Sequence, residues 1–205
     1  MYISPRHFVS SPDGFPKTLE DQIDLIFAQI DGWHLEVADR CINGWNIKEK
    51  QSIDTVNLLN QQTNHVPDAG WAVLQMVLNY FETIAWLKLG SKSYKSKHYE
   101  LFEWGVLDVF PELENRKSEI KKILWGQFRT GLYHYGPIKG NVVLTHTVDT
   151  QPLIFDDTQK AFILDPHKFI PKLRTHFREY CDRLNDTNES DLRDKFKVAY
   201  EASRK

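Results

Sequence analysis

The sequence lacks any apolar run of about 18 residues, the length expected of a membrane-spanning helix. Its most apolar stretch, residues 71–89, is interrupted by Gln75, Asn79, Glu82 and Lys88. The first 17 residues contain three prolines and one glycine but no apolar core, so they do not have the pattern of a signal peptide. We therefore expect a soluble, cytoplasmic protein without membrane contact, in which residues 1–18 form an N-terminal arm.

The sequence also has few cysteines and a small net charge. The two cysteines, Cys41 and Cys181, both fall within apolar helical patterns, which favours buried thiols over a disulfide. The formal net charge of −2 gives no overall attraction to nucleic acid or to an acidic membrane. An interaction with nucleic acid would therefore depend on a local site. The 205 residues, 41% of them hydrophobic, suffice for one domain with a sizeable core.

Several motifs that carry chemistry are missing as well. The chain has no G-x-x-x-x-G-K-[ST] or G-x-G-x-x-G loop for a nucleotide phosphate, and no G-x-S-x-G elbow for a nucleophilic serine. It has no C-x-x-C pair, and its eight histidines show no H-x-x-x-H spacing, which argues against a structural zinc site. We expect neither a cofactor nor a metal.

What the sequence does contain is helical periodicity. Thr18 and Asp21 have capping-box spacing, although Glu or Gln is the favoured second residue, and a helix is predicted to begin there. Its expected apolar stripe is Ile23, Phe27, Ile30, His34, Val37 and Cys41. Further helices are predicted over 48–63, where the apolar stripe is weak, over 68–90 with an end at Gly90, and over 112–134. A short helix before the last of these is interrupted by Pro111. The expected fold is mainly α, with 19–45, 68–90 and 112–134 packed as one bundle.

The period changes after residue 138. Alternating apolar residues over 142–148 predict a strand, and 152–155 and 160–164 predict two more, joined by the turn "DDTQ". We interpret about residues 138–164 as a small antiparallel β insert. Asp165 and Pro166 suit the N-cap and first position of a long closing helix. The domain is expected to span 19–187, followed by a polar C-terminal tail, 188–205, that forms a frayed helix.

Three polar residues within these patterns call for an interpretation. His34 lies on the apolar stripe of the first helix, where a hydrogen-bonded core histidine is the default. His146 lies in a strand pattern and is most simply a surface or half-buried residue. Glu82, inside the aromatic stretch "NYFETIAW", either pairs with Arg129 as a buried carboxylate or faces solvent. The sequence leaves this last choice open.

The stretch "GQFRTGLYHYG", residues 126–136, carries the candidate catalytic pair, Arg129 and His134. Histidine can move protons near neutral pH, and arginine offers a planar fork of donors to a phosphate that gains charge in a transition state. Together they suit metal-independent RNA cleavage, in which the ribose 2′-hydroxyl is the nucleophile and the protein needs none of its own. A structural interpretation also fits: Arg129 anchors a carboxylate, and His134 caps the end of the helix.

Helix geometry limits how these two residues act together. Five positions along a regular α-helix turn the chain by about 140°, so the two side chains would not share a face. Either the helix is distorted near Gly131, or a two-fold symmetric partner completes the site. We therefore expect a homodimer.

The order of segments resembles the HEPN superfamily (higher eukaryotes and prokaryotes nucleotide-binding domain). The resemblance rests on "LQMVLNYFETIAWLKLG", "DVFPEL", "FRTGLYHYG" and the closing "DPHKFIPKLRTHFREYCDRL", and it covers roughly residues 19–187. The signature of that family is an arginine, four to six intervening residues and a histidine, which Arg129 and His134 match with four intervening residues. The "R-x-G-L-x-H" form followed by a β hairpin is similar to a bacterial HEPN-like subgroup.

The resemblance implies a helical bundle that is usually dimeric. In active branches it implies a metal-independent endoribonuclease in toxin–antitoxin, abortive-infection or other defence systems, with RNA as substrate and an antitoxin as a possible partner. Other branches are non-catalytic and act in binding or assembly. Active members commonly have Asn, Asp or His directly after the arginine, whereas this chain has Thr130. We expect Thr130 and Tyr133, within the same motif, to contact a bound substrate.

Overall fold

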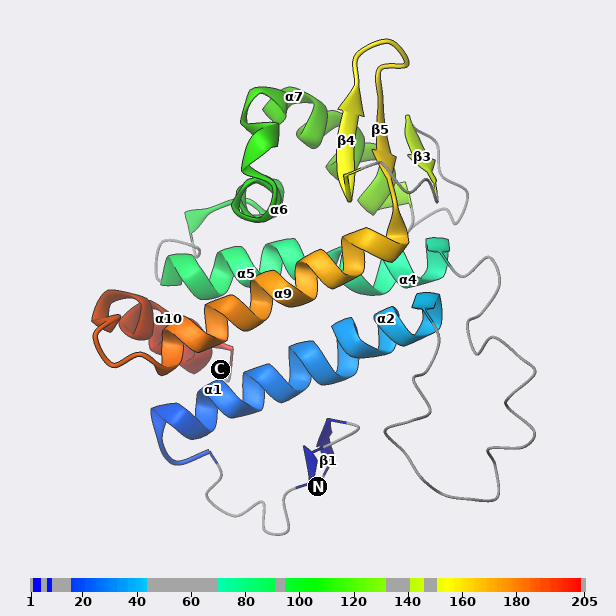
Figure 1. Ribbon diagram of the computed structural model, residues 1–205. Helices are drawn as coiled ribbons and strands as arrows, with labels where there is room; N and C mark the ends of the chain where they lie inside the picture. Colours follow the sequence, from blue (N-terminus) through cyan, green and yellow to red (C-terminus); the bar gives the residue numbers. More distant parts are fainter. Residues whose placement is uncertain are drawn as a thin grey trace, which may run out of the picture.

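Helices form most of the computed structural model, which describes residues 2–4, 7–8, 16–43, 70–90, 95–131, 141–145 and 151–203. Three long helical segments lie side by side in the lower half of Figure 1, and a smaller group of helices with a three-stranded sheet lies above them. At the N-terminus, strands β1 (Tyr2–Ser4) and β2 (His7–Phe8) pair antiparallel, and β1 lies against the first helical segment. Within the described ranges, no helix combines the length and apolar character needed to cross a membrane.

The first long segment consists of α1 (Leu19–Phe27), the π-helix η1 (Ala28–Leu35) and α2 (Glu36–Asn43). Its predicted start is confirmed. The Thr18 hydroxyl accepts a hydrogen bond from the Asp21 backbone N–H at 3.0 Å, and the Asp21 carboxylate accepts one from the Thr18 N–H, also at 3.0 Å. Asp therefore completes this capping box in place of the commoner Glu.

The apolar stripe predicted for this segment is wrong in its second half. After Ile30, the buried positions include Asp31, Leu35, Ala38 and Ile42, each one residue later than the even α-helical spacing from Ile23 predicts. The cause is η1, because a π-helix accommodates an extra residue in the turn and so shifts the phase of everything after it. The prediction that His34 is a core histidine is wrong for the same reason, since His34 is exposed.

The second segment, α4 (Gly70–Val77) and α5 (Asn79–Leu89), ends at Gly90 as predicted. Gly90 has a φ of 57°, which favours glycine, and a Cβ there would lie 3.0 Å from the backbone of Lys195. Helix α6 (His98–Val109) packs on α5 and stops before Pro111, which begins the 3-10 helix η4 (Pro111–Arg116), as the sequence predicts. Helix α7 (Lys117–Glu119) then leads into the π-helix η5 (Ile120–Arg129).

The three-stranded sheet is mixed, which corrects the prediction of an antiparallel insert. Strands β4 (Leu153–Asp156) and β5 (Ala161–Leu164) form the predicted antiparallel hairpin, but β3 (Val142–Leu144) pairs parallel with β5. The strand order is β3-β5-β4. The chain reverses direction twice between β3 and β5, so a central β5 must run the same way as β3. The strongly buried sequence of β5 explains its central place, because a neighbour on each edge satisfies its backbone.

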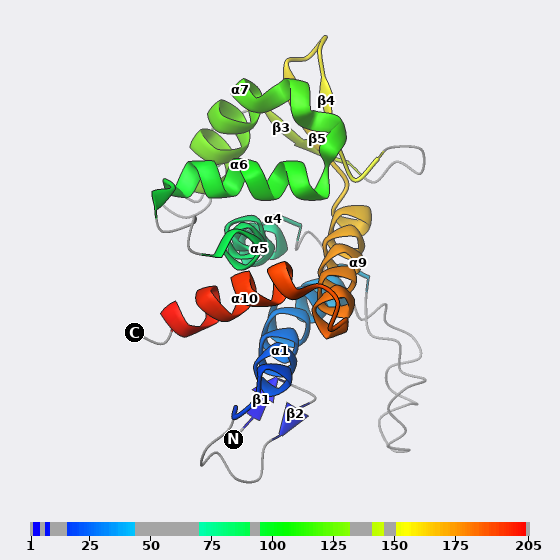
Figure 2. The same cartoon turned by 90° about the vertical axis from the view of Figure 1, so that its left-hand side faces the viewer.

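The third long segment is α9 (Pro166–Asn185), and α10 (Ser190–Ala202) follows it. The predicted start of α9 is confirmed, since the Asp165 side chain accepts a hydrogen bond from the His167 N–H at 3.0 Å and Pro166 is the first helical residue. The prediction of a helix near the C-terminus is also confirmed, but its description as frayed is wrong. Helix α10 packs on α5 (Figure 2) and buries four residues at helical spacing among its charged ones: Leu192, Phe196, Ala199 and Tyr200.

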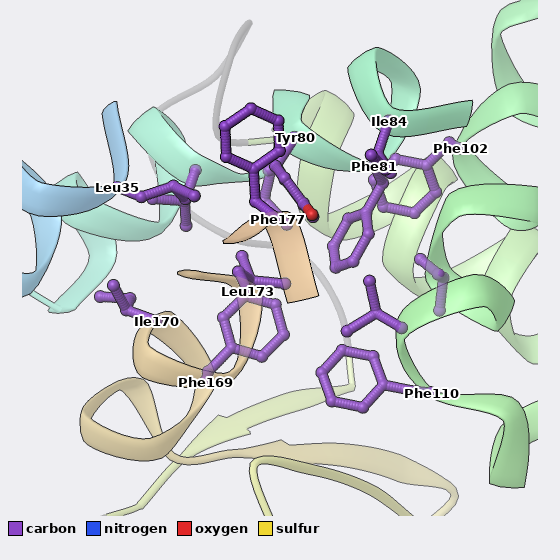
Figure 3. Packing of buried hydrophobic residues seen from close by; sticks show 14 of the residues in the cluster. Leu35, Tyr80, Phe81, Ile84, Phe102, Phe110, Phe169, Ile170, Leu173 and Phe177 are labelled. Carbon is purple, nitrogen blue, oxygen red and sulfur yellow. The ribbon is translucent and has the colours of Figure 1, made fainter. Parts of the chain in front are cut away.

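One aromatic-rich core joins these segments. Phe81 of α5 lies at its centre, with its ring centroid 5.3, 6.4 and 5.9 Å from those of Phe102, Phe110 and Phe169 (Figure 3). The same core includes buried residues of α1, α4, η5 and α10. The described parts of 19–45, 68–90 and 112–134 therefore pack as one bundle, as predicted. Cys41 and Cys181 are both free thiols; Cys181 is buried, whereas Cys41 is half-buried.

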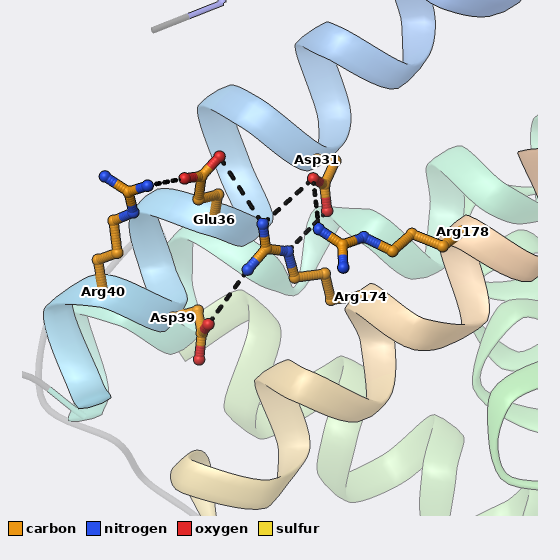
Figure 4. A network of polar contacts seen from close by, with 6 residues as sticks. All are labelled: Asp31, Glu36, Asp39, Arg40, Arg174 and Arg178. Carbon is orange, nitrogen blue, oxygen red and sulfur yellow. Dashed lines mark hydrogen bonds and ion pairs between the residues drawn. The ribbon is translucent and has the colours of Figure 1, made fainter. Parts of the chain in front are cut away.

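A polar network fastens α9 to η1 and α2 (Figure 4). Arg174 of α9 donates to Asp31 at 2.8 Å and to Asp39 at 3.3 Å, and its guanidinium also lies 3.7 Å from a Glu36 oxygen. Arg178 donates to the second Asp31 oxygen at 3.2 Å. Asp31 and Glu36 are buried, so these arginines neutralise carboxylates that would otherwise be costly inside the protein. The network explains how Asp31 and Glu36 can be buried on the first helical segment.

The predicted helix over 48–63, as well as His146, Tyr133 and His134, lie outside the described residues.

Candidate functional site

Arg129 lies in the last turn of η5 and forms an ion pair with Glu82 of α5. Its Nη2 atom is 2.6 Å from Glu82 Oε1, and the two side chains are 21% and 15% exposed. This contact answers the choice that the sequence left open, because Glu82 does not simply face solvent. The pair joins η5 to the central helix of the bundle.

Trp125 supports the arginine from within the same helix. The Arg129 guanidinium carbon lies 4.4 Å from the centroid of the Trp125 ring, within the range of a cation–π interaction. The Thr130 hydroxyl donates to the Trp125 carbonyl oxygen at 2.9 Å, a contact five residues back along the chain that suits the wider π-helical turn. Thr130, predicted to contact substrate, is therefore half-buried and bonded to the backbone of its own helix.

His98 completes the cluster from a third element, the first residue of α6. Its Nδ1 atom lies 3.0 Å from Glu82 Oε2, so the two Glu82 oxygens contact one histidine and one arginine. The His98 side chain is 83% exposed, in contrast to its two partners. We call Glu82, His98, Trp125 and Arg129 the Glu82 site.

Two lysines and a tyrosine are close to residues of the Glu82 site in the sequence. Lys121 Nζ is 4.2 Å from the centroid of the Tyr99 ring, and Lys97 Nζ is 5.9 Å from it. Tyr99 follows His98 on α6, and Lys121 lies one turn before Trp125 on η5. This combination of positive charge with an aromatic ring suits contact with a phosphate backbone and its bases.

Sequence reasoning found Arg129 and its alternative partner Glu82 but missed His98. The histidine is 16 residues from Glu82 along the chain and on another helix, so no short motif joins them. The one available signal was the basic stretch 91–97 directly before it, whose most economical interpretation is a solvated loop. The other half of the predicted pair, His134, lies three residues beyond Gly131, the last described residue of this stretch.

Helix η5, which carries Arg129, is not a regular α-helix. Residues 120–129 are π-helical, and a π-helix turns the chain through a smaller angle per residue than an α-helix. This π-helix ends at Arg129, so it does not test the distortion expected near Gly131; Thr130 and Gly131 are α-helical, and residues 132–134 lie outside the described ranges. The relative placement of Arg129 and His134 stays a prediction.

A second polar cluster lies between α5, α6 and α9, outside the Glu82 site. The Tyr80 hydroxyl and His176 Nδ1 are 2.6 Å apart, and His176 Nε2 is 3.1 Å from Asp108 Oδ2, which Lys88 Nζ approaches to 2.5 Å. Burial opposes ionisation of Asp108, but hydrogen bonds from His176 and Lys88 outweigh it and hold the pKa of Asp108 below its usual value. Burial, together with the Asp108 charge, raises the pKa of Tyr80 well above its usual value. The Tyr80 hydroxyl therefore keeps its proton in this cluster.

A groove of about 550 Å³ lies between η1 and the α4–α5 segment. Trp33 and Met76, which are 46% and 38% exposed, are among its lining residues, as is the exposed His34. Apolar side chains dominate its wall, so it is not a site for phosphate chemistry.

In the described ranges, no group of three or more His, Cys, Asp or Glu side chains is placed to hold a metal ion. Comparisons of the chain with protein-family models, with curated proteins and with solved structures find no match.

Proposed function

We propose that this chain is a HEPN-like protein that cleaves single-stranded RNA without a metal, at a site containing Arg129 and His134. The observation that carries the proposal is the Glu82 site, in which one carboxylate holds an arginine at 2.6 Å and an exposed histidine at 3.0 Å. Arginine and histidine are the two side chains that this reaction needs. The R-x4-H spacing in the sequence supplies the second histidine, His134.

The reaction is an internal transesterification. The ribose 2′-oxygen bonds to phosphorus as its proton leaves, the bond from phosphorus to the 5′-oxygen breaks, and that oxygen takes up a proton. The guanidinium stabilises the negative charge that builds up on the non-bridging phosphate oxygens. The products are a 2′,3′-cyclic phosphate and a 5′-hydroxyl, and no nucleophile from the protein is required.

Contact with substrate is supported by the surroundings of the Glu82 site. Lys97 and Lys121 combine positive charge with the Tyr99 ring, next to His98 in the sequence or one turn before Trp125, together with the Glu100 carboxylate, which accepts a hydrogen bond from the Tyr99 hydroxyl. Such a local combination favours single-stranded nucleic acid, whose unpaired bases can stack while its phosphates meet lysines.

The same proposal includes a cytoplasmic homodimer that acts in a toxin or defence setting and is held in check by an antitoxin protein. A two-fold symmetric dimer would bring two Arg129–His134 pairs to one groove. A standard-size interface would bury about 1,600 Å² in total. Light scattering should give twice the monomer mass of 24.1 kDa at high micromolar concentration, and a strict monomer would contradict the shared site.

The test of the proposed activity uses single-stranded RNA in the presence of EDTA. Wild type should cleave it, and Arg129→Lys should cripple turnover, because lysine keeps the charge but loses the planar fork that also stacks on Trp125. His134→Ala should lower kcat by about 10²–10⁴-fold, the usual contribution of a general acid or base. Wild-type protein that is inert toward a broad RNA panel would refute the proposal.

A second candidate is a non-catalytic HEPN-like interaction module, in which Arg129 is structural. The observation in its favour is that Arg129 is mostly buried against Glu82 and the Trp125 ring. This candidate predicts no metal-independent cleavage by wild type. It also predicts a clearly lower melting temperature for Arg129→Ala, since a largely buried carboxylate would lose its main cation.

A further inference from the structure

We infer that His98 is the general base of the Glu82 site and that Glu82 positions its ring. This inference rests on the proposed RNA cleavage and deepens it by assigning one of the two proton transfers. His98 lies outside the R-x4-H motif and on a different helix from Arg129. In this assignment His98 takes the proton from the 2′-hydroxyl, and the leaving 5′-oxygen takes up a proton from water.

The contact with Glu82 sets the tautomer of His98. A carboxylate only accepts hydrogen bonds, so the contact of 3.0 Å between His98 Nδ1 and Glu82 Oε2 requires the proton to be on Nδ1. In the neutral ring, Nε2 then carries the lone pair. A neutral imidazole with a fixed Nδ1–H and a basic Nε2 is the form that a general base needs.

The His98 ring is open to solvent. Glu82 is 15% exposed and holds Nδ1 at the protein surface, whereas the His98 side chain as a whole is 83% exposed. A substrate can therefore reach the ring without any rearrangement of the core. Arg129, the other partner of the same carboxylate, is 21% exposed, so the cation and the base lie on either side of Glu82.

The backbone that carries His98 is held in place by α6. His98 begins α6, and the backbone before it is fixed because Lys97 N–H donates to Glu100 Oε2 at 2.9 Å. The far end of α6 is buried in the aromatic core. A side chain at this position is held by a helix that belongs to the bundle, whereas a histidine on a loop would lose more entropy on adopting one geometry.

His98 as base and Arg129 as phosphate-binding cation thus contact the same carboxylate, Glu82. His98 Nε2 removes the 2′-hydroxyl proton as the bond from that oxygen to phosphorus forms. Arg129 stabilises the charge on the phosphate, and the imidazolium of His98 afterwards returns its proton to solvent. Glu82 does not touch the substrate; it positions His98 and Arg129 and stabilises the imidazolium.

The test compares His98→Gln with His34→Gln, a matched change at an exposed histidine on η1, outside the Glu82 site. Glutamine keeps a donor for Glu82 but cannot act as a base near neutral pH. We expect kcat of His98→Gln to fall about 10²–10⁴-fold, and the rise of kcat/KM with pH that reports the free base to disappear. His34→Gln should leave both unchanged. Cleavage by wild type together with an unaltered rate in His98→Gln would overturn the role of His98 alone.

A readout independent of activity is the tautomer of His98 by ¹⁵N NMR of the histidine ring. A neutral ring with its proton on Nδ1 supports the positioning by Glu82. A proton on Nε2 would overturn the inference, because the basic nitrogen would then face Glu82. If wild type cleaves no RNA, the proposed function and the catalytic role of His98 are refuted together, whatever the tautomer.

Discussion

Gly105→Ala should damage both the stability of the bundle and the Glu82 site. Gly105 lies where α6 crosses α5, and a Cβ there would lie 2.6 Å from the carbonyl carbon of Phe81 and 2.8 Å from its Cα. These are backbone atoms, so no side-chain rotation relieves the overlap. The two helices must separate, although Phe81 is 1% exposed and lies at the centre of the aromatic core.

The expected cost follows from two opposing terms. Overpacking of a well-packed core costs about 1–3 kcal/mol and occasionally more, and here the obstacle is backbone, which favours the upper end. Alanine regains about 1 kcal/mol over glycine in a helix interior. From the upper end of that range, a net destabilisation of about 2 kcal/mol remains. For a domain of this size, that lowers the melting temperature by about 2–4 °C per kcal/mol.

The consequence for the site follows from neighbouring positions. Glu82 directly follows Phe81 on α5, and His98 begins α6, so separation of these helices lengthens the contact of 3.0 Å between Glu82 and His98. Urea denaturation followed by tryptophan fluorescence measures the stability, and ring NMR reports the His98 tautomer. Gly126→Ala is the matched control, because its added Cβ meets nothing closer than 3.4 Å and should stabilise η5 slightly. If Gly105→Ala were as stable as this control, the close crossing of α5 and α6 would be wrong.

Three further predictions test other parts of the structure. Arg174→Ala should destabilise the protein by about 3–5 kcal/mol, measured by urea denaturation, because the buried Asp31 loses most of its compensation; a change below about 1 kcal/mol would contradict the network. Phe196→Ala should cost about 3–5 kcal/mol, since this residue of α10 is fully buried, whereas a frayed helix would tolerate the change. Burial opposes ionisation of Asp108, but hydrogen bonds from His176 and Lys88 lower its pKa in the folded protein. Its stabilising contribution is therefore complete above the pKa of the unfolded state and lost as the pH falls through the lower folded value; Asp108→Asn should remove this part of the acid dependence of unfolding, and an identical acid profile would refute the pairing with Lys88 and His176.

Local signals predicted the element boundaries well. The capping box at Thr18, the end at Gly90, the break at Pro111 and the start at Asp165 are all confirmed, because each depends on residues within a few positions of one another. The same holds for the β4–β5 hairpin and its turn. Short-range chemistry of this kind is visible in a single sequence.

The errors come from features that no short stretch of the sequence marks. The π-helix η1 shifts the buried face by one residue, and no residue type within it marks that extra turn. The parallel pairing of β3 depends on which strand takes the centre of the sheet, which is decided by burial against the bundle. The burial of α10 depends on its partner α5, more than 100 residues earlier in the chain.

Part of the candidate site could likewise be predicted from local sequence, and part could not. Arg129 was predicted from a short sequence motif, and Glu82 was named as a possible partner because a carboxylate inside an aromatic stretch needs compensation. His98 could not be predicted, since its contact with Glu82 depends on how α6 crosses α5, and Gly105 fixes that crossing. The geometry that brings a base to the arginine is therefore a property of the packing.

The most direct measurement of the central claim is the chemistry of the RNA ends after incubation with wild-type protein in EDTA. Attack by the 2′-hydroxyl at the Glu82 site predicts fragments that end in a 2′,3′-cyclic phosphate, with 5′-hydroxyls on the other side of each cut. A substrate with a single 2′-deoxy residue at the cleavage position should resist cutting there. Fragments with a 3′-hydroxyl and a 5′-phosphate, or cleavage that persists at the 2′-deoxy position, would contradict the account.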